Sequence, residues 1–228
     1  QPDGRILVGG RFTQIDGVNR NRIARLLSTG AIDPGFNPGT GADGEVMTIA
    51  QQANGKILIG GAFTEFDGQS CVRIVRLNSD GSIDSCLNPG AEGGNVTLLM
   101  PLDDGKWLAG GTFTSLQGET RTRLARLALP EAALQSLGYD QSRRVVWRRG
   151  GAAPEFSRLP RVSHFAGDQL LERRLAYFGG EWRFTAQQAP NDFASAFLRA
   201  RGESQVGYFG GSQGRVITEQ AFYRGDSI

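Results

Sequence analysis

The fold is decided by a nine-residue stretch that occurs three times along the chain. The middle copy reads Lys56-Ile57-Leu58-Ile59-Gly60-Gly61-Ala62-Phe63-Thr64, and related copies occupy residues 5–13 and 106–114. Each copy is followed by a second block of the form Arg-aliphatic-aliphatic-Arg-Leu, at residues 22–26, 73–77 and 123–127. Because both blocks return in register about every 50 residues, the first part of the chain is a tandem repeat.

A third block closes the first two repeats. It contains Gly30-Ala31-Ile32-Asp33 with Asn37-Pro38-Gly39 in the first repeat, and Gly81-Ser82-Ile83-Asp84 with Asn88-Pro89-Gly90 in the second. The third repeat continues into Ala128-Leu129-Pro130 instead. We therefore expect the third repeat to end differently from the other two.

Each repeat is predicted to form short antiparallel strands separated by tight turns. In the middle repeat we expect strands over residues 45–52, 56–63, 71–78 and 82–87. Turns at Asn54-Gly55 and Ser79-Asp80-Gly81 connect them. The uninterrupted apolar run Ile57-Leu58-Ile59 indicates a strand that is covered on both faces. Four antiparallel strands repeated in tandem are typical of β-propeller blades. A parallel β-solenoid, whose coils are usually shorter, is the second interpretation.

The repeat predicts equivalent positions in successive blades. Leu7, Leu58 and Leu108 are expected to be buried at the same place in each sheet. The glycine pairs are expected to share one structural environment, at Gly9, Gly10, Gly60, Gly61, Gly110 and Gly111. We expect ten strands in total, three in the first repeat, four in the second and three in the third. Because a closed propeller needs at least about four blades, upstream blades of a longer polypeptide are expected to complete the ring, with another copy of the chain as the second choice.

The second half of the chain has a different pattern. The repeat covers residues 1–128, and residues 129–142 are expected to form a linker with or without a short helical turn at 130–134. Over residues 143–228, strands are expected at 143–149, 161–166, 171–178, 181–188, 195–201 and 215–223. This number of strands in so short a segment predicts an immunoglobulin-like β-sandwich. Its core is expected to use Trp147, Phe165, Trp182, Phe184 and Phe197.

The composition excludes several classes of function. The 228 residues include 25 Lys+Arg and 23 Asp+Glu, for a net charge of +2, and a single histidine. So small a net charge argues against a nucleic-acid partner, and one histidine cannot build a multi-histidine metal site. No apolar run is long enough to span a membrane, and the first residues lack the basic-then-apolar pattern of a signal peptide. We expect no cofactor and no bound metal.

The single histidine, His164, is expected to have a structural or surface role. It lies in a predicted strand next to Ser163. Neighbouring residues in a strand point to opposite faces, so these two cannot act together as base and nucleophile. We therefore expect no catalytic residue from this pair.

Arginine and aspartate recur in phase with the repeat. Arg25, Arg76 and Arg126 occupy the second block, while Asp33 and Asp84 occupy the third block of the first two repeats. Residues placed in this way meet across a hairpin, so an Arg–Asp pair is expected in the first and second repeats. A set of catalytic carboxylates is the alternative. The acidic turn at residues 80–84 lacks the ligand spacing of an EF-hand and is predicted to be a turn rather than a calcium site.

Two alternative functions depend on residues outside the repeated set. An enzyme acting on extracellular polysaccharide would need paired carboxylates on one propeller face, and the remaining acidic residues show no motif: Asp43, Glu45, Glu65, Glu92 and Glu119. A glycan-binding lectin could use Trp107 or Trp182 as a stacking platform. An indole exposed in a groove would favour the lectin hypothesis, and burial of both indoles would exclude it.

The two cysteines, Cys71 and Cys86, both lie in the second repeat. If the turn at 79–81 closes a hairpin, Cys86 lies opposite a residue near Arg73, about one diagonal step from Cys71. A disulfide between them would indicate an oxidising compartment. Two buried free thiols are the alternative, and the sequence leaves both open.

The first half of the chain resembles the delta-60 repeat. The matching residues are 1–10, Ile23-Ala24-Arg25-Leu26, Gly30 with Ile32-Asp33, and Phe36-Asn37-Pro38-Gly39. This bacterial propeller-type repeat occurs in large secreted and surface proteins. Kelch repeats share the Gly-Gly pair but also carry a Tyr and Trp pair that is missing here.

The second half is similar to the C-terminal module that often follows delta-60 arrays. The matching segments are 146–150, 154–155, 180–182, 199–202 and 207–212. The resemblance implies a terminal β-module and no catalytic residues. The delta-60 resemblance implies a secreted or bacterial cell-surface protein. The leading hypothesis is a non-enzymatic, structural or adhesive role, with a protein or glycan on a cell surface as the partner.

Overall fold

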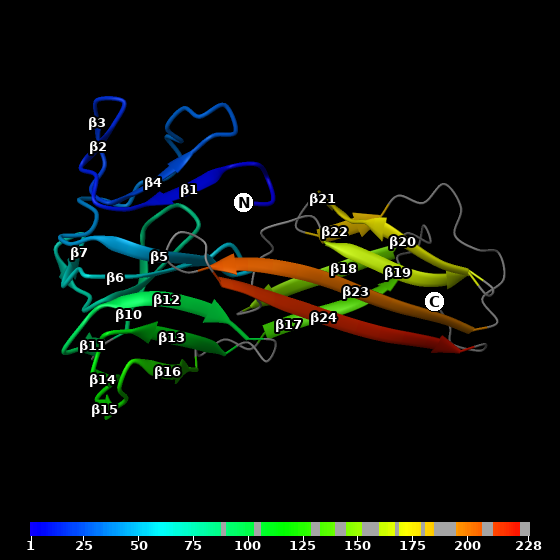
Figure 1. The fold of residues 1–228 in the computed structure, drawn as a ribbon. Coiled ribbons are helices and arrows are strands. Elements are labelled where there is room, and N and C mark those ends of the chain that lie inside the picture. The colour runs from blue at the N-terminus through cyan, green and yellow to red at the C-terminus, as the bar shows by residue number, and fades with distance from the viewer. Residues whose placement is uncertain are drawn as a thin grey trace.

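The computed structural model describes residues 1–87, 90–102, 106–128, 133–139, 145–151, 160–166, 169–178, 181–184, 195–206 and 212–223. Every regular element in these ranges is a β-strand, and the strands pair antiparallel. Figure 1 shows two parts, the repeats at the N-terminal end and a group of longer strands at the C-terminal end. We call the sheets formed by residues 5–33, 45–87 and 95–128 blade one, blade two and blade three.

Blade two contains all four expected strands. They are β5 (Val46–Gln51), β6 (Ile57–Gly61), β9 (Ile74–Leu77) and β10 (Ile83–Cys86), in the spatial order β10-β9-β6-β5. Each lies inside its predicted range. The turns form where glycine adopts a positive φ, 84° at Gly55 and 95° at Gly81, a conformation that other residues adopt only at a cost.

Blades one and three are smaller. Blade one pairs β1 (Ile6–Gly9) with β4 (Ile23–Leu26), and a single bridge from Leu26 to Ile32 stands where a third strand was expected. Blade three has the order β12-β13-β16, formed by β12 (Val96–Pro101), β13 (Trp107–Gly111) and β16 (Leu124–Leu127). In blade one, β1 therefore stands at the inner edge, with no strand at the position of β5.

Three two-residue hairpins were not predicted from the sequence. They are β2 (Gln14–Ile15) with β3 (Val18–Asn19), β7 (Glu65–Phe66) with β8 (Gln69–Ser70), and β14 (Ser115–Leu116) with β15 (Glu119–Thr120). β14 also pairs with β11 (Ala91–Glu92). Strands of two residues are too short to show an alternating pattern. Their turns have positive φ at both central residues, such as 47° at Asp67 and 71° at Gly68, as a type I′ turn requires.

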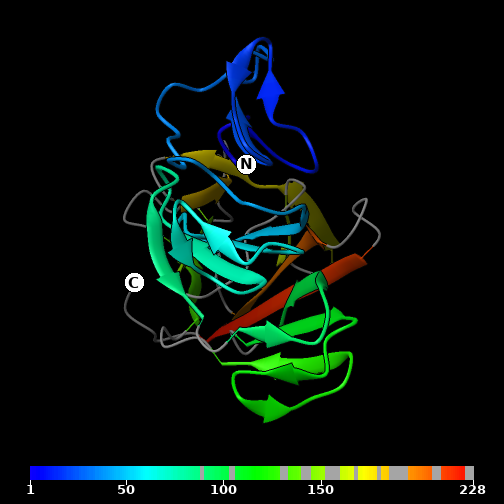
Figure 2. The ribbon, with the colours of Figure 1, turned by 90° about the vertical axis from the view of Figure 1, so that its left-hand side faces the viewer.

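The blades lie one against the next (Figure 2), and two apolar clusters lie between them. The cluster between blades one and two includes Ile23, Val46, Ile57 and Ile59, together with Phe36, Phe63 and Phe66. The cluster between blades two and three includes Leu58, Ile74, Val96, Leu99 and Trp107. Successive residues of β6 thus face opposite neighbours, which explains the uninterrupted apolar run of that strand.

The leucine prediction is correct in register and only partly correct in burial. Leu7, Leu58 and Leu108 each lie opposite an arginine of the second block. Leu58 is fully buried, whereas Leu7 and Leu108 are half-buried. Leu108 faces the side on which no further blade lies in this structure, whereas Leu7 packs against the cluster between blades one and two but lies on β1, an edge strand of blade one.

The glycine environments agree where a following blade exists. A Cβ atom at Gly9 would lie 2.6 Å from Val46, and one at Gly60 would lie 2.7 Å from Val96, both on the inner strand of the next blade. At Gly110 the nearest atoms belong to Leu98 of the same blade. The second glycine is crowded by its own sheet in blades two and three, as Gly61 is by the carbonyl of Glu45, whereas a Cβ at Gly10 would make only ordinary contact with Phe12 at 3.5 Å.

The described C-terminal strands form two four-stranded sheets. One has the order β17-β18-β22-β21, made of β17 (Ala133–Tyr139), β18 (Val145–Gly151), β22 (Glu181–Phe184) and β21 (Ala176–Phe178). The other has the order β20-β19-β23-β24, made of β20 (Gln169–Arg174), β19 (Arg161–Ala166), β23 (Ser195–Val206) and β24 (Ser212–Tyr223). Strand β17 lies within the segment expected to be a linker, because its seven residues pair along the whole of β18.

The described core of this part contains Leu137, Val145, Trp147, Val162, Leu175, Trp182 and Ala200. Trp147 and Trp182 are therefore core residues, as predicted. The side chains of Phe165, Phe184 and Phe197 lie outside the described residues, as do residues 185–188 of one expected strand. The long hairpin β23–β24 lies beside the inner strands β5 and β12 of blades two and three (Figure 1).

Candidate functional site

The three short hairpins project from the same side of the blades and form what we call the hairpin face (Figure 1). Its exposed side chains are mostly polar: Gln14, Asn19, Glu65, Gln69, Ser70, Glu119 and Thr120. Beneath them, Phe66 and Leu116 are buried and attach two of the hairpins to the core. Exposed polar loops on a rigid framework are where proteins commonly carry their binding residues.

Two acidic residues hold the hairpins in place. The Asp43 carboxylate accepts hydrogen bonds from the Thr64 amide (2.7 Å), the Thr64 hydroxyl (2.6 Å) and the Glu65 amide (2.9 Å). At the corresponding place in blade three, Glu92 accepts one from the Ser115 hydroxyl at 3.2 Å. Desolvation opposes ionisation of Asp43, but these hydrogen bonds outweigh it and hold the pKa of Asp43 below its ordinary value.

The equivalence of Asp43 and Glu92 was missed in the sequence, where both were taken as scattered residues. Ala42 bridges to Phe66, and Ala91 pairs with Leu116 in the same way. Along the chain, Glu92 follows Asp43 at a distance one residue shorter than the offset of the repeat between blades two and three. An alignment that keeps this offset fixed therefore does not match the two residues. Comparing the residues that precede each hairpin, instead of keeping the strict repeat, could have revealed it.

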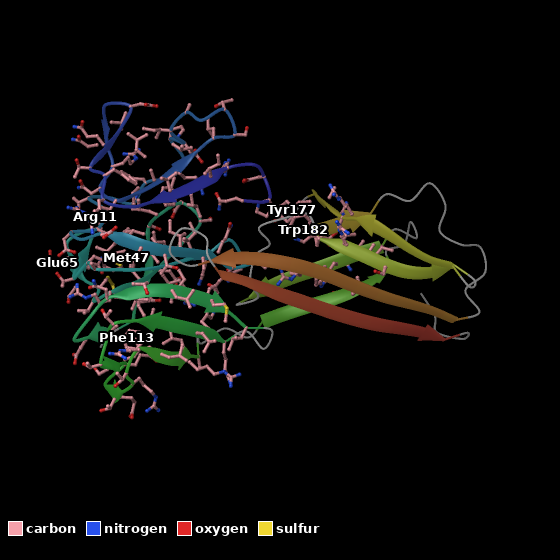
Figure 3. The ribbon with its side chains drawn as sticks, in the orientation of Figure 1. Arg11, Met47, Glu65, Phe113, Tyr177 and Trp182 are labelled. Carbon is pink, nitrogen blue, oxygen red and sulfur yellow. A yellow bond between two sulfur atoms is a disulfide. The ribbon has the colours of Figure 1, made fainter. Side chains whose placement is uncertain are left out.

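Other charged residues of the hairpin face connect neighbouring blades (Figure 3). Arg11 of blade one forms an ion pair of 2.8 Å with Glu45 of blade two. The Thr40 amide, in the segment that joins the two blades, donates to the Asp67 carboxylate at 2.8 Å. Asp43, Glu45 and Glu92 therefore have partners within the scaffold.

The predicted Arg–Asp pairs are present in blades one and two. Arg25 Nε lies 2.7 Å from the Asp33 carboxylate, and Arg76 Nε lies 2.6 Å from that of Asp84. Each aspartate has a second cation, Arg5 at 3.3 Å from Asp33 and Lys56 at 2.8 Å from Asp84. The same three-residue cluster is thus built twice from equivalent positions.

The first cluster also connects two blades. Arg25 donates to the Ser79 carbonyl of blade two, and its guanidinium lies 5.0 Å from the centre of the Phe36 ring. Burial raises the pKa of Asp33, but hydrogen bonds from the Gly35 amide and Arg25 outweigh it, so that the pKa is lowered. Burial likewise raises the pKa of Asp84, but hydrogen bonds from Lys56 and Arg76 outweigh this effect, so that the pKa of Asp84 is also lowered. Carboxylates that stay ionised in this way fit a structural role better than that of a general acid.

Arg126 occupies the same register position in blade three, opposite Leu108. It is exposed, whereas Arg25 and Arg76 are each only 5% exposed. The third repeat has no aspartate where the other two have Asp33 and Asp84. The Arg–Asp pair therefore belongs to blades one and two, as the sequence indicated.

The remaining candidates are not brought together. Ser163 is buried in β19, and the side chain of His164 lies outside the described residues. Trp107 and Trp182 are 0% and 3% exposed, so neither indole offers a stacking platform. Within the described ranges, no three His, Cys, Asp or Glu side chains are grouped as metal ligands would be. The same ranges contain no helix with the length and hydropathy needed to cross a membrane.

Cys71 and Cys86 form a disulfide, with their Cα atoms 4.9 Å apart. Cys86 lies opposite Val75 in the ladder, two residues from Arg73 and so close to the expected register. Arg73 has a φ of 68°, so the chain between Cys71 and β9 departs from an extended strand. This bend lies between Cys71 and the strand that pairs with Cys86.

The repeats match a family described as a domain of unknown function (DUF5122) beta-propeller. The match covers residues 1–36, 52–85 and 102–129, which correspond to the three blades. No curated protein and no solved structure matches the chain. Residues 1–129 are therefore beta-propeller repeats of the DUF5122 type.

Proposed function

We propose that this chain is a non-enzymatic scaffold of the extracellular space or bacterial cell surface, which contacts protein or glycan through its hairpin face. The observation that carries the proposal is the use of the recurring charged residues. Asp33, Asp43 and Asp84 each hold strands or hairpins together and stay ionised. The hairpin face leaves Glu65 and Glu119 exposed on a rigid framework.

The extracellular part of the proposal is supported by the disulfide of blade two, because such bonds persist mainly in oxidising compartments. The resemblance to delta-60 repeats and to their C-terminal module points the same way. In cells of the source organism, thiols trapped by alkylation before lysis should show Cys71 and Cys86 oxidised, in a secreted or surface fraction. Reduced thiols in a cytoplasmic fraction would contradict this localisation.

Binding can be tested with the labelled 228-residue chain on intact source cells. Changing Glu65→Arg and Glu119→Arg together should lower the bound amount several-fold, because both side chains are exposed on the hairpin face. Ser28→Arg is a matched control, since Ser28 is exposed in the turn at the opposite end of β4. If Ser28→Arg lowered the bound amount equally, the hairpin face would not be the binding surface.

An enzyme acting on polysaccharide is the alternative. It would require two carboxylates about 5–10 Å apart that are not engaged in the ion pairs and hydrogen bonds of the scaffold. A panel of extracellular polysaccharides incubated with the chain should show no turnover. Turnover that is lost in Glu65→Gln or Glu119→Gln would overturn the non-enzymatic role.

A further inference from the structure

Blades one and two contain equivalent segments that have different conformations. Residues 83–87 of blade two correspond to residues 32–36 of blade one. In both blades the first residue of the segment pairs with the preceding strand, as Ile83 does with Leu77. Beyond that pair the two segments take different courses.

In blade one the segment leaves the ladder and forms a turn. The Gly35 amide donates to the Asp33 carboxylate at 2.8 Å, and the Phe36 amide donates to the Asp33 carbonyl at 3.2 Å. A carboxylate that accepts from the backbone two residues further on forms an Asx turn. Pro34, within the turn, has no amide hydrogen and cannot donate to a neighbouring strand.

In blade two the same segment stays in the sheet as β10. Ser85 pairs with Arg76 and Cys86 with Val75, after a shift in register. The four residues of β10 are only half-buried, so packing alone holds this strand weakly. The disulfide adds a covalent bond from Cys86 to the fully buried Cys71.

The disulfide occurs only in the blade that has β10. The positions that correspond to Cys71 carry Arg20 and Arg121, and Gly35 stands where blade two has Cys86. A disulfide needs Cα atoms about 4.4–6.8 Å apart. The distance between Cys71 and Cys86 is 4.9 Å with Cys86 in the ladder. The bond therefore holds the end of β10 against β9.

The residues of blade two are also compatible with the turn of blade one. Asp84 stands in place of Asp33 and offers the same carboxylate to the amide of Cys86. The φ of Gly35 lies outside the left-handed region, so a cysteine can adopt this backbone conformation. A Cβ atom at Gly35 would lie 3.2 Å from the Asp33 carboxylate, which needs to move by only a few tenths of an ångström. Ser85, in contrast to a proline, can follow either course.

We propose that the Cys71–Cys86 bond is a thiol-controlled switch. In the oxidised chain the bond holds residues 84–87 in the sheet, and in the reduced chain these residues adopt the turn seen in blade one. Such a switch needs an element with two conformations and a chemical change that selects between them. Both conformations are present in this structure, at equivalent positions of two blades.

The reductant is a dithiol, and the step is thiol–disulfide exchange. A thiolate of the dithiol attacks Sγ of Cys86, because Cys86 is half-buried whereas Cys71 is 0% exposed. The S–S bond breaks, and Cys71 leaves as a thiolate and takes up a proton. The second thiol of the reductant then displaces Cys86, so that the two cysteines become thiols and the dithiol becomes a disulfide.

The switch changes the outer edge of blade two. In the turn conformation, Val75 and Arg76 of β9 lose their partners in the ladder. The ion pairs of Asp84 with Arg76 and Lys56 are retained, as the equivalent pairs of Asp33 exist beside the turn in blade one. This inference concerns conformation and does not depend on the proposed function.

NMR spectroscopy of the 228-residue chain tests the switch. In the oxidised chain, nuclear Overhauser effects should connect Ser85 and Cys86 with β9. Dithiothreitol should abolish these contacts while those between β5 and β6 persist. Amide exchange of residues 85–87 should then accelerate at least about tenfold relative to residues 57–61. Contacts between Cys86 and Val75 that persist in the reduced chain would overturn the switch. Simultaneous loss of the β5–β6 contacts would also overturn it, because the bond would then hold the whole fold.

Two variants separate the turn from the loss of the bond. The triple variant Cys71→Ser, Ser85→Pro, Cys86→Gly copies Asp33-Pro34-Gly35 into blade two and serves as the reference for the turn. The amide resonance of Leu87 in the reduced wild type should move toward its position in this variant. The matched control Cys71→Ser, Cys86→Ser should resemble the reduced wild type and not respond to dithiothreitol. If this control keeps the pairing of β10 with β9, the disulfide does not select the conformation and the proposal is wrong.

Discussion

Replacing Gly60 by alanine probes the stacking of blade two against blade three. The added Cβ would lie 2.7 Å from Val96 Cγ1, 2.8 Å from Thr48 Cγ2 and 3.2 Å from Leu99 Cδ1. Carbon atoms in contact are normally about 3.5–4.0 Å apart. Val96 and Thr48 are β-branched and have few alternative rotamers, so they cannot easily move away. The backbone of blade two or blade three must shift to admit the methyl group.

The expected cost follows from two opposing effects. Overpacking a core by one carbon typically destabilises by about 1–3 kcal/mol. Removing a glycine restricts the unfolded chain and stabilises by about 0.4–1 kcal/mol. Gly60→Ala should therefore lower the free energy of unfolding by about 1–2 kcal/mol.

Gly110→Ala is the matched control, because Gly110 has the same place in blade three. Its Cβ would meet only Leu98 of the same blade, at 3.3 Å, and a leucine side chain has room to adjust. The free energy of unfolding of this variant should stay within about 0.5 kcal/mol of the wild type. Urea unfolding followed by tryptophan fluorescence measures both variants. Equal destabilisation at Gly60 and Gly110 would show that contact with a following blade is not the cause.

Two further predictions concern the ionised clusters and the disulfide. Because the pKa values of Asp33 and Asp84 are lowered in the folded chain, their stabilisation is complete above the unfolded pKa of about 3.9 and is lost as the pH falls through the folded values. Urea unfolding between pH 6 and pH 2 should show this loss in the wild type, and Asp84→Asn should flatten the curve; an unchanged curve would contradict it. Reducing the Cys71–Cys86 bond, which spans 15 residues, should lower the free energy of unfolding by about 3 kcal/mol. A Cys71→Ser, Cys86→Ser variant should not respond to reductant, and a wild type that is equally insensitive would contradict the role of the bond.

The sequence predicted most of the local structure of the repeats. The apolar runs and turn residues placed β5, β6, β9 and β10 within their observed ranges, because strand and turn preferences act over a few neighbouring residues. The Arg25–Asp33 and Arg76–Asp84 pairs followed from the same local geometry. The whole of β17 was missed, because its pairing with β18 is not signalled by the residues of β17 alone.

What the sequence determined by itself is thus the repeat, its strands and the residues that meet across one hairpin. The tertiary structure decided which copies of a repeated position are fully buried: Leu58 is, and Leu108 is not. It also decided that the acidic residues Asp43 and Glu92 share one role. It also brought Cys71 to Cys86 through a bend that no turn motif marks. The physical reason is that strand formation depends on neighbours along the chain, whereas burial and partner choice depend on whether another blade lies against the sheet.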